Sequence, residues 1–216
     1  MYNLVEKIST NIAGKQKKKN QIILTHTSRD VEEYLTSLKY RMNGKFNRTP
    51  HYVVSKDGTV IKTLNHEAYS NYFEEINVNR NSIIICLENL GWLEKVPLKD
   101  QYTNWIGNIY KGVPYEKKWR DYFFWDPYTE TQLISTAELC INLIKENKIE
   151  KKCVGHNTQI EGIEKFGGIV SHSNFSKNFT DVSPAFNFEQ FVKYIKDEQF
   201  VWWNKKTLEI IERNEG

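Results

Sequence analysis

The sequence predicts an α/β fold in which helices flank a central mixed β-sheet. Two apolar runs, residues 22–24 and 83–85, have the length and β-branched composition of strands buried in the middle of a sheet. Helix patterns alternate with the strand patterns, as in sheets whose strands are joined by helices. The 216 residues fit one domain over 1–216 with a core at about 20–196. The sequence contains no run of about 18 apolar residues, so no membrane span is predicted.

The first strand pattern leads directly into a helix pattern. Residues 21–26 are mostly apolar and end on His26, which places this side chain at the edge of the expected sheet. Asp30 is suited to cap the helix that follows. The apolar positions of that helix recur at helical spacing and are Val31, Leu35, Leu38 and Met42.

A hairpin and a second buried strand come next. Strand-like residues 51–55 and 59–63 flank an Asp-Gly pair at positions 57 and 58, and such a pair is a strong hairpin signal. Residues 82–88 form another buried strand pattern, which ends on the carboxylate of Glu88.

The second half of the chain is predicted to hold two helices around a short strand. Thr129 and Gln132 form a capping-box pattern in front of a long amphipathic helix. The apolar positions of this helix include Leu133, Ala137, Cys140 and Ile144. A short strand over 152–154 then leads to His156, and Asn187 opens the final helix.

Composition and charge narrow the class of protein. The three cysteines, Cys86, Cys140 and Cys153, lack metal-type spacing and are typical of reduced, buried thiols. A net charge of +3 favours approach to a polyanion such as a cell wall or a nucleic acid without specifying either. The first twenty residues lack the apolar segment of a signal peptide, so we expect cytoplasmic synthesis without one.

Three side chains far apart in the sequence have the chemistry of a metal site. His26 ends a strand, His156 follows a short strand, and Asp181 begins a segment that ends in Pro-Ala-Phe. Two neutral imidazoles and one carboxylate leave the fourth tetrahedral position of zinc open for water, which is the arrangement of a catalytic site. These three residues are therefore the expected ligands of Zn²⁺.

The order of the motifs resembles the zinc-dependent N-acetylmuramoyl-L-alanine amidases, which share a fold with peptidoglycan recognition proteins and amidase-type phage lysozymes. The resemblance covers roughly residues 20–196. It rests on the strand ending in His, the His-Tyr-Val-Val hairpin, the strand ending in Leu-Glu-Asn, the long helix, Gly-His, and Asp-x-x-Pro-Ala-Phe. It implies a zinc in a surface groove that hydrolyses the amide between N-acetylmuramic acid and L-alanine. His26 and Asp181 then take the family's first and third ligand positions.

The resemblance also implies a partner and a role. The expected substrate is peptidoglycan, and the expected role is that of a phage-type endolysin that acts on the bacterial cell wall after release. The alternatives are a cytoplasmic amidase that recycles muropeptides and a recognition module that binds without cutting. A complete ligand set favours an enzyme over a recognition module. We expect no nucleic-acid partner, because the zinc spacing has no purpose there, and we expect a monomer.

The second ligand has two candidates. His156 occupies the family's Gly-His position after the long helix, yet it precedes Asp181 by 25 residues, and about ten are usual in the family. His172 precedes Asp181 by nine residues and would be the ligand if the last strand were 168–171. We prefer His156, because a strand directly after the long helix is the expected topology, and assign His172 to the substrate or oxyanion.

A general base and an oxyanion partner complete the expected mechanism. Glu88 is the candidate base, because it ends a strand near the metal and could deprotonate the bound water. The family often places a lysine two residues before the third ligand, but this chain has Phe179 there, so Lys177 or His172 could replace it. His51 is interpreted as a buried hydrogen-bonding residue or as a substrate contact.

Residues 92–128 form an aromatic insertion. They contain 11 of the 29 aromatic residues, and regular structure is not evident in their sequence. Long loops of this kind tend to be functional, so Trp92, Trp105 and Trp125 are candidates for a groove wall that holds the glycan. A satellite core under the loop is the alternative, with equal support. The tail over 197–216, with Trp202 and Trp203, is expected either to dock on the domain or to contact the cell wall, and the sequence does not decide between these.

Overall fold

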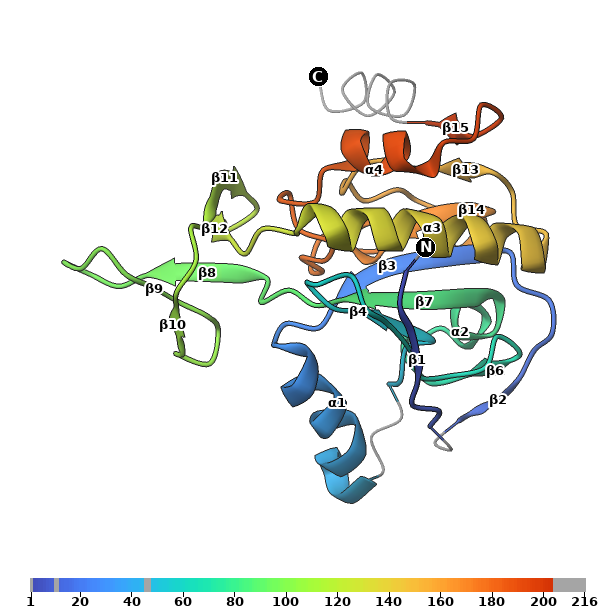
Figure 1. Ribbon diagram of the computed structural model, residues 1–216, viewed down its shortest axis with the longest axis horizontal. Helices are drawn as coiled ribbons and strands as arrows, with labels where there is room; N and C mark the ends of the chain where they lie inside the picture. The colour runs from blue at the N-terminus through green and yellow to red at the C-terminus, as the bar shows by residue number, and fades with distance from the viewer. Residues whose placement is uncertain (1, 10–11, 45–47, 204–216) are drawn as a thin grey trace.

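A computed structural model describes residues 2–9, 12–44 and 48–203 of the chain (Figure 1). Its largest element is an eight-stranded mixed sheet, in which only the β4–β5 hairpin is antiparallel. In spatial order the strands are β1 (Leu4–Glu6), β5 (Val60–Lys62), β4 (Tyr52–Val54), β7 (Ser82–Leu87), β3 (Gln21–His26), β14 (Gly168–Ser171), β13 (Lys152–Cys153) and β15 (Val201–Trp202). The predicted fold class, a central mixed sheet flanked by helices, is confirmed.

The helices and two smaller sheets complete the architecture. The helices are α1 (Val31–Tyr40), α2 (Ile76–Asn81), α3 (Glu130–Asn147) and α4 (Phe188–Ile195), with 3₁₀ turns η1 (Arg41–Gly44), η2 (Ile163–Lys165) and η3 (His172–Asn174). The five-stranded antiparallel sheet has the order β10 (Ile109–Tyr110), β9 (Tyr102–Thr103), β8 (Trp92–Lys95), β12 (Tyr122–Trp125) and β11 (Tyr115–Trp119), and the third sheet pairs β2 (Gly14–Lys15) with β6 (Ala68–Tyr69). Among the described residues, no helix is long and apolar enough to cross a bilayer.

The helix starts follow from their capping residues. Asp30 accepts a hydrogen bond from the third residue of α1, and Asn187 does the same for α4. Thr129 caps α3 by accepting from the Gln132 amide, but the Gln132 side chain does not close the capping box. It donates instead to the carbonyls of Val54 and Glu88, and so ties α3 to the ends of β4 and β7.

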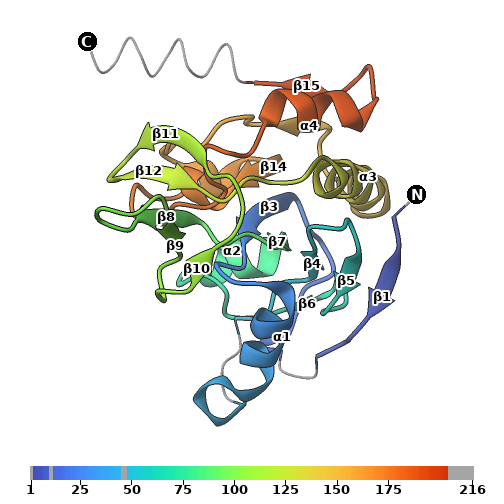
Figure 2. The same ribbon diagram turned by 60° about the vertical axis from the view of Figure 1, so that its left-hand side comes forward.

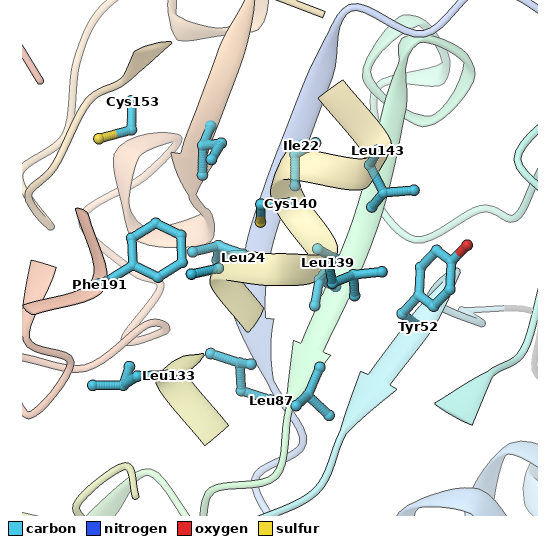
Figure 3. Packing of buried hydrophobic residues seen from close by; sticks show 14 of the residues in the cluster. Ile22, Leu24, Tyr52, Leu87, Leu133, Leu139, Cys140, Leu143, Cys153 and Phe191 are labelled. Carbon is cyan, nitrogen blue, oxygen red and sulfur yellow. The ribbon is translucent and has the colours of Figure 1, made fainter. Parts of the chain in front are cut away.

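Alternation along the strands divides the core between the two faces of the sheet. Ile22 and Leu24 of β3 face α3, where Leu139, Cys140 and neighbouring side chains bury them completely (Figure 3). Ile23 faces the other side, where it packs with residues of α2, η2 and the following loop. Because both faces of β3 are covered, its apolar run is continuous, as expected for a central strand.

The aromatic insertion is folded, contrary to the expectation of an irregular loop. It forms the five-stranded antiparallel sheet, which projects from one end of the central sheet (Figures 1 and 2). Its ring-to-ring contacts include Trp92 stacked on Tyr122 at 4.6 Å between centroids and Trp119 tilted against Trp125 at 5.5 Å. The strands are only two to five residues long, which explains why their alternation was not visible in the sequence.

The strand next to β3 determines which histidine reaches the sheet edge beside His26. That strand is β14, which pairs in parallel with β3 from Gly168 opposite Gln21 to Ser171 opposite Leu24. The strand directly after α3 is β13, as expected from topology, but it lies one position further out. His172, immediately after β14, is therefore the histidine beside the end of β3.

Candidate active site

Three of the predicted site residues meet at the carboxyl ends of β3 and β14. His172 Nδ1 lies 2.8 Å from Asp181 Oδ2, and His26 lies close enough to both for its charge to interact with theirs. His26 and Asp181 are each only 8% exposed. Side chains at the ends of β3 and β14 converge because these two strands are parallel neighbours, so their carboxyl ends lie at the same edge of the sheet.

The charge states of this group follow from burial and proximity. Burial by itself would raise the pKa of Asp181, but His172, His26 and the hydrogen bonds from His172 and Thr25 outweigh it and hold that pKa well below its ordinary value. Burial, together with the nearby His172, lowers the pKa of His26 despite the opposing carboxylate. At neutral pH the site therefore holds an ionised Asp181 and a neutral His26.

Each of the three side chains is held by further contacts. The Tyr128 hydroxyl lies 3.2 Å from His26 Nδ1 and accepts from the backbone N–H of Ser183 at 3.3 Å. The Thr25 hydroxyl donates to Asp181 Oδ2. The His172 ring stacks on Phe179, with centroids 3.7 Å apart.

Gly91 leaves space at the other edge of the His26 ring. It has a φ of +80°, and a Cβ atom built at this position would lie 3.1 Å from His26 Nε2. Since Nδ1 is engaged by Tyr128, Nε2 is the nitrogen that faces this space.

The group lies in a cavity of about 450 Å³. Trp92 and Trp105 line one side, and the Trp105 indole donates to the Ser28 carbonyl at 2.6 Å. Three arginines also line it: Arg29, Arg41 and Arg48. The lining of the cavity is thus both aromatic and basic, and the Arg29 guanidinium lies 5.4 Å from the centroid of the Trp105 ring.

Three other predicted site residues lie elsewhere. His156 lines a separate cavity at the end of β13. The Glu88 carboxylate accepts from the backbone N–H groups of Val31 (3.2 Å) and Lys56 (2.8 Å), and so joins α1 to the hairpin without lining the cavity. His51 is fully buried. The expectations that His156 would join His26, that Glu88 would face the metal position and that His51 would touch substrate are therefore not supported by the geometry.

Trp125, a candidate for the groove wall, lies in the core of the five-stranded sheet. It is completely buried, and its indole donates to the Lys117 carbonyl at 2.8 Å, so it is core of the five-stranded sheet and not groove wall. Trp92 and Trp105 do line the cavity, as expected for wall residues. The core interpretation thus describes Trp125, and the groove-wall interpretation stays a prediction for Trp92 and Trp105.

Several cavity residues were not identified from the sequence. Thr25 precedes His26 in a strand, where alternation suggests that neighbours point to opposite faces. Tyr34 could have been found, because it falls on the same face of α1 as Val31 and Leu38. Tyr72 carries no local signal, although its hydroxyl lies 3.3 Å from Thr25 Oγ1 and its ring lines the cavity.

The types of donor atom in the site suit a metal ion, although the side chains are not arranged around a metal position. Within the part of the chain that the structure describes, no cluster of three or more His, Cys, Asp or Glu side chains has the arrangement of a metal site as it stands. Asp181 Oδ2 accepts from both His172 and Thr25. The donor types and charge states nevertheless suit zinc, which binds neutral imidazoles and ionised carboxylates. The space that Gly91 leaves beside His26 Nε2 is consistent with a ligand there.

Comparisons with known proteins point to one enzyme family. The model of the N-acetylmuramoyl-L-alanine amidase family matches residues 15–178. No curated protein matches the chain. Among solved structures, the N-acetylmuramoyl-L-alanine amidase LysC from Clostridium intestinale URNW is similar at a TM-score of 0.55 and 14% identity, over 92% of this chain and 100% of that one.

Two further structures share the fold at low identity. Staphylococcus aureus hydrolase AmiA, in complex with its ligand, has a TM-score of 0.56 and 11% identity, over 91% of this chain and 83% of that one. The E. coli amidase AmiD, in complex with anhydro-N-acetylmuramic acid-L-Ala-D-gamma-Glu-L-Lys, has a TM-score of 0.54 and 16% identity, over 92% of this chain and 64% of that one.

Proposed function

The chain belongs to the N-acetylmuramoyl-L-alanine amidase family, and from this premise we propose that its cavity hydrolyses the amide between N-acetylmuramic acid and L-alanine in peptidoglycan with a bound Zn²⁺. His26, His172 and Asp181 are the proposed ligands. The observation that carries the proposal is the meeting of these three side chains in one cavity, with Asp181 ionised and His26 neutral as zinc requires. When bound, zinc supplies Lewis-acid catalysis and lowers the pKa of a coordinated water.

His172 replaces His156 in this ligand set for a topological reason. A ligand must lie within about 2 Å of the same metal as His26, and the strand beside β3 is β14. The eight residues between His172 and Asp181 then suffice to bring the carboxylate back to the imidazole.

The chain's own residues orient the ligands and the substrate. Thr25 and Tyr128 hold Asp181 and His26 from outside the ligand set, a role typical of groups that fix ligand orientation. Burial raises the pKa of Tyr34 and of Tyr72 well above the ordinary value, so both phenols stay protonated. They are the proposed donors to the developing oxyanion in place of the lysine that Phe179 replaces.

The opening of the cavity suits a peptide that carries carboxylates. Its lining includes Arg29, Arg41 and Arg48, and among the described residues Asp181 is the only carboxylate in it. A guanidinium pairs well with a carboxylate in bidentate geometry. Stem peptides of peptidoglycan carry such groups, so the arginines mark the proposed peptide side of the cavity, with Trp105 beside Arg29.

Metal content tests the ligand assignment. Zinc should co-purify with the wild-type chain at one ion per chain, and His172→Ala should lose both zinc and activity. His156→Ala is the matched control, since it removes another buried imidazole and should retain zinc. Loss of zinc from His156→Ala with retention in His172→Ala would refute the assignment and restore the sequence-based preference.

The bond that is cut tests the reaction. Digestion of peptidoglycan should expose the amino group of L-alanine without new reducing ends, because glycoside cleavage usually needs two carboxylates flanking the sugar bond. New reducing ends without free alanine would contradict the amidase proposal. Binding without either product would indicate a recognition module.

The biological role is a further part of the proposal. An endolysin must act on intact walls, whereas a recycling amidase acts on soluble muropeptides. We propose the endolysin role, which predicts clearing of purified cell walls at a rate comparable with turnover of soluble fragments. Turnover confined to soluble fragments would favour recycling.

A further inference from the structure

A second cavity, of about 620 Å³, lies at the end of β13 and shares no lining residue with the active-site cavity. Gly155 and His156, which follow β13 after Val154, line it. Its walls come from β11, from the segment between Asp181 and α4, and from β15. Nothing in the proposed amidase reaction uses this cavity.

Two N–H donors in the cavity lack an acceptor. His156 is only 7% exposed, and its Nδ1 accepts from the backbone N–H of Thr158 at 3.1 Å. Burial lowers the His156 pKa to about 4, so near neutral pH the ring is neutral and its proton lies on Nε2. Within the described residues neither His156 Nε2 nor Trp202 Nε1 has a partner. Trp202 Nε1 lies directly against Gly155, where a Cβ atom would be 1.7 Å from it. An unpaired buried donor typically costs roughly 1–3 kcal/mol, so His156 Nε2 is the donor that calls for a ligand with an acceptor.

The walls supply aromatic faces around these donors. Tyr115 is 41% exposed, and Trp119, Phe188 and Trp202 are half-buried. The guanidinium of Arg120 lies 4.1 Å from the centroid of Trp119 and fixes that ring from one side. Lys117 and Glu189 add one charge of each sign, so the cavity does not select strongly for a charged ligand.

We infer that this cavity binds an N-acetylated hexose of the glycan strand. Such a sugar has apolar C–H faces that pack on aromatic rings, and its acetamide carbonyl and hydroxyl oxygens accept from N–H donors. The inference rests on the proposed function, because that function makes a glycan of N-acetylated sugars the natural substrate.

The five-stranded sheet connects this sugar cavity to the active site. Strands β8 and β11 belong to this one sheet (Figure 2). Strand β8 contributes Trp92 to the active-site cavity, and β11 contributes Tyr115 and Trp119 to the sugar cavity. A glycan unit held against β11 therefore contacts the same rigid sheet that forms one side of the catalytic cavity. The sheet is the element through which glycan binding would position the stem peptide.

Titration with N,N′-diacetylchitobiose, which carries no peptide, tests the inference directly. The sugar should shift the ring resonances of His156 and the indole N–H of Trp202 in the NMR spectrum of the wild-type chain. Trp119→Ala, which changes a half-buried wall residue, should weaken sugar binding about tenfold, in line with the roughly 1–1.5 kcal/mol expected of one aromatic contact. His66→Ala removes a histidine that lines neither cavity and should bind as the wild type does.

The outcomes separate this inference from the proposed function. A chain that exposes alanine amino groups on peptidoglycan, yet shows no shift of His156 or Trp202 with the sugar, would overturn the sugar cavity and leave the amidase proposal intact. Shifts produced by an L-alanyl-D-glutamyl peptide but not by the sugar would make the cavity a peptide site and also overturn the inference. Sugar binding in a chain without hydrolysis would support the cavity and contradict the amidase proposal.

Discussion

His51 makes the stability of the fold depend on pH. Its ring is fully buried, Nδ1 accepts from the Ile84 N–H at 3.1 Å, and Nε2 lies 2.9 Å from the Ala68 carbonyl. Protonation of the ring would put a proton on Nδ1, which could then no longer accept the hydrogen bond from Ile84. Burial, reinforced by the nearby Lys19, accordingly lowers the pKa of His51 to about 3.

The sign and size of the effect follow from this pKa. Between pH 6.5, the ordinary histidine value, and pH 3 the unfolded chain binds a proton at residue 51 and the native chain does not. The free energy of unfolding therefore falls as the pH falls through this window. At about 1.4 kcal/mol per pH unit, His51 removes about 2 kcal/mol between pH 7 and pH 5, and about 3 kcal/mol by pH 4.

Urea unfolding of the wild type and His51→Gln, followed by tryptophan fluorescence, measures this loss. The amide of the variant does not titrate in the window, so the wild type should lose about 2 kcal/mol more than the variant between pH 7 and pH 5. Any constant destabilisation of the variant cancels, and the other histidines titrate in both proteins. Parallel pH profiles for the two proteins, within about 0.5 kcal/mol, would refute the reasoning.

Three further predictions concern residues outside the proposed ligand set. Glu88→Gln should lower the free energy of unfolding by roughly 1–3 kcal/mol, because a carboxylate with two backbone hydrogen bonds is lost, while zinc content stays unchanged; loss of zinc would return Glu88 to the site. Gly155→Ala should destabilise the fold by more than about 2 kcal/mol in thermal unfolding, because the new Cβ would lie 1.7 Å from Trp202 Nε1. Gly162→Ala is the control: its φ is +74° but nothing lies within 4 Å of the new Cβ, so it should cost only about 1–2 kcal/mol. Equal losses in the two variants would contradict the contact with Trp202. Burial lowers the Lys19 pKa to about 8, so the unfolded chain binds more protons than the native chain up to about pH 10.5. Between pH 7 and pH 9 the free energy of unfolding of the wild type should therefore rise by about 1 kcal/mol relative to that of Lys19→Met. A difference between the two proteins that does not change with pH would count against the burial of Lys19.

Local patterns were sufficient wherever the physics is local. The continuous apolar run of β3, the caps of α1 and α3 and the Asp-Gly turn between β4 and β5 each depend on residues a few positions apart, and the structure contains all of them. The same holds for His26, because the end of a buried strand necessarily lies at the sheet edge. Short strands such as those of the aromatic insertion escaped, because two to five residues cannot establish a period of two.

The choice between His156 and His172 needed the tertiary structure. Both histidines follow short strands, and the order of strands in a sheet is set by packing between segments far apart in the chain. The same is true of Glu88, whose carboxylate is taken by backbone N–H groups of α1 and the hairpin, and of Trp125, whose burial depends on the sheet around it. The sequence by itself determined the fold class, the family resemblance and two of the proposed ligands, because these depend on the type and order of residues. Only the tertiary structure decided which side chains share a cavity, because that depends on which strands become neighbours.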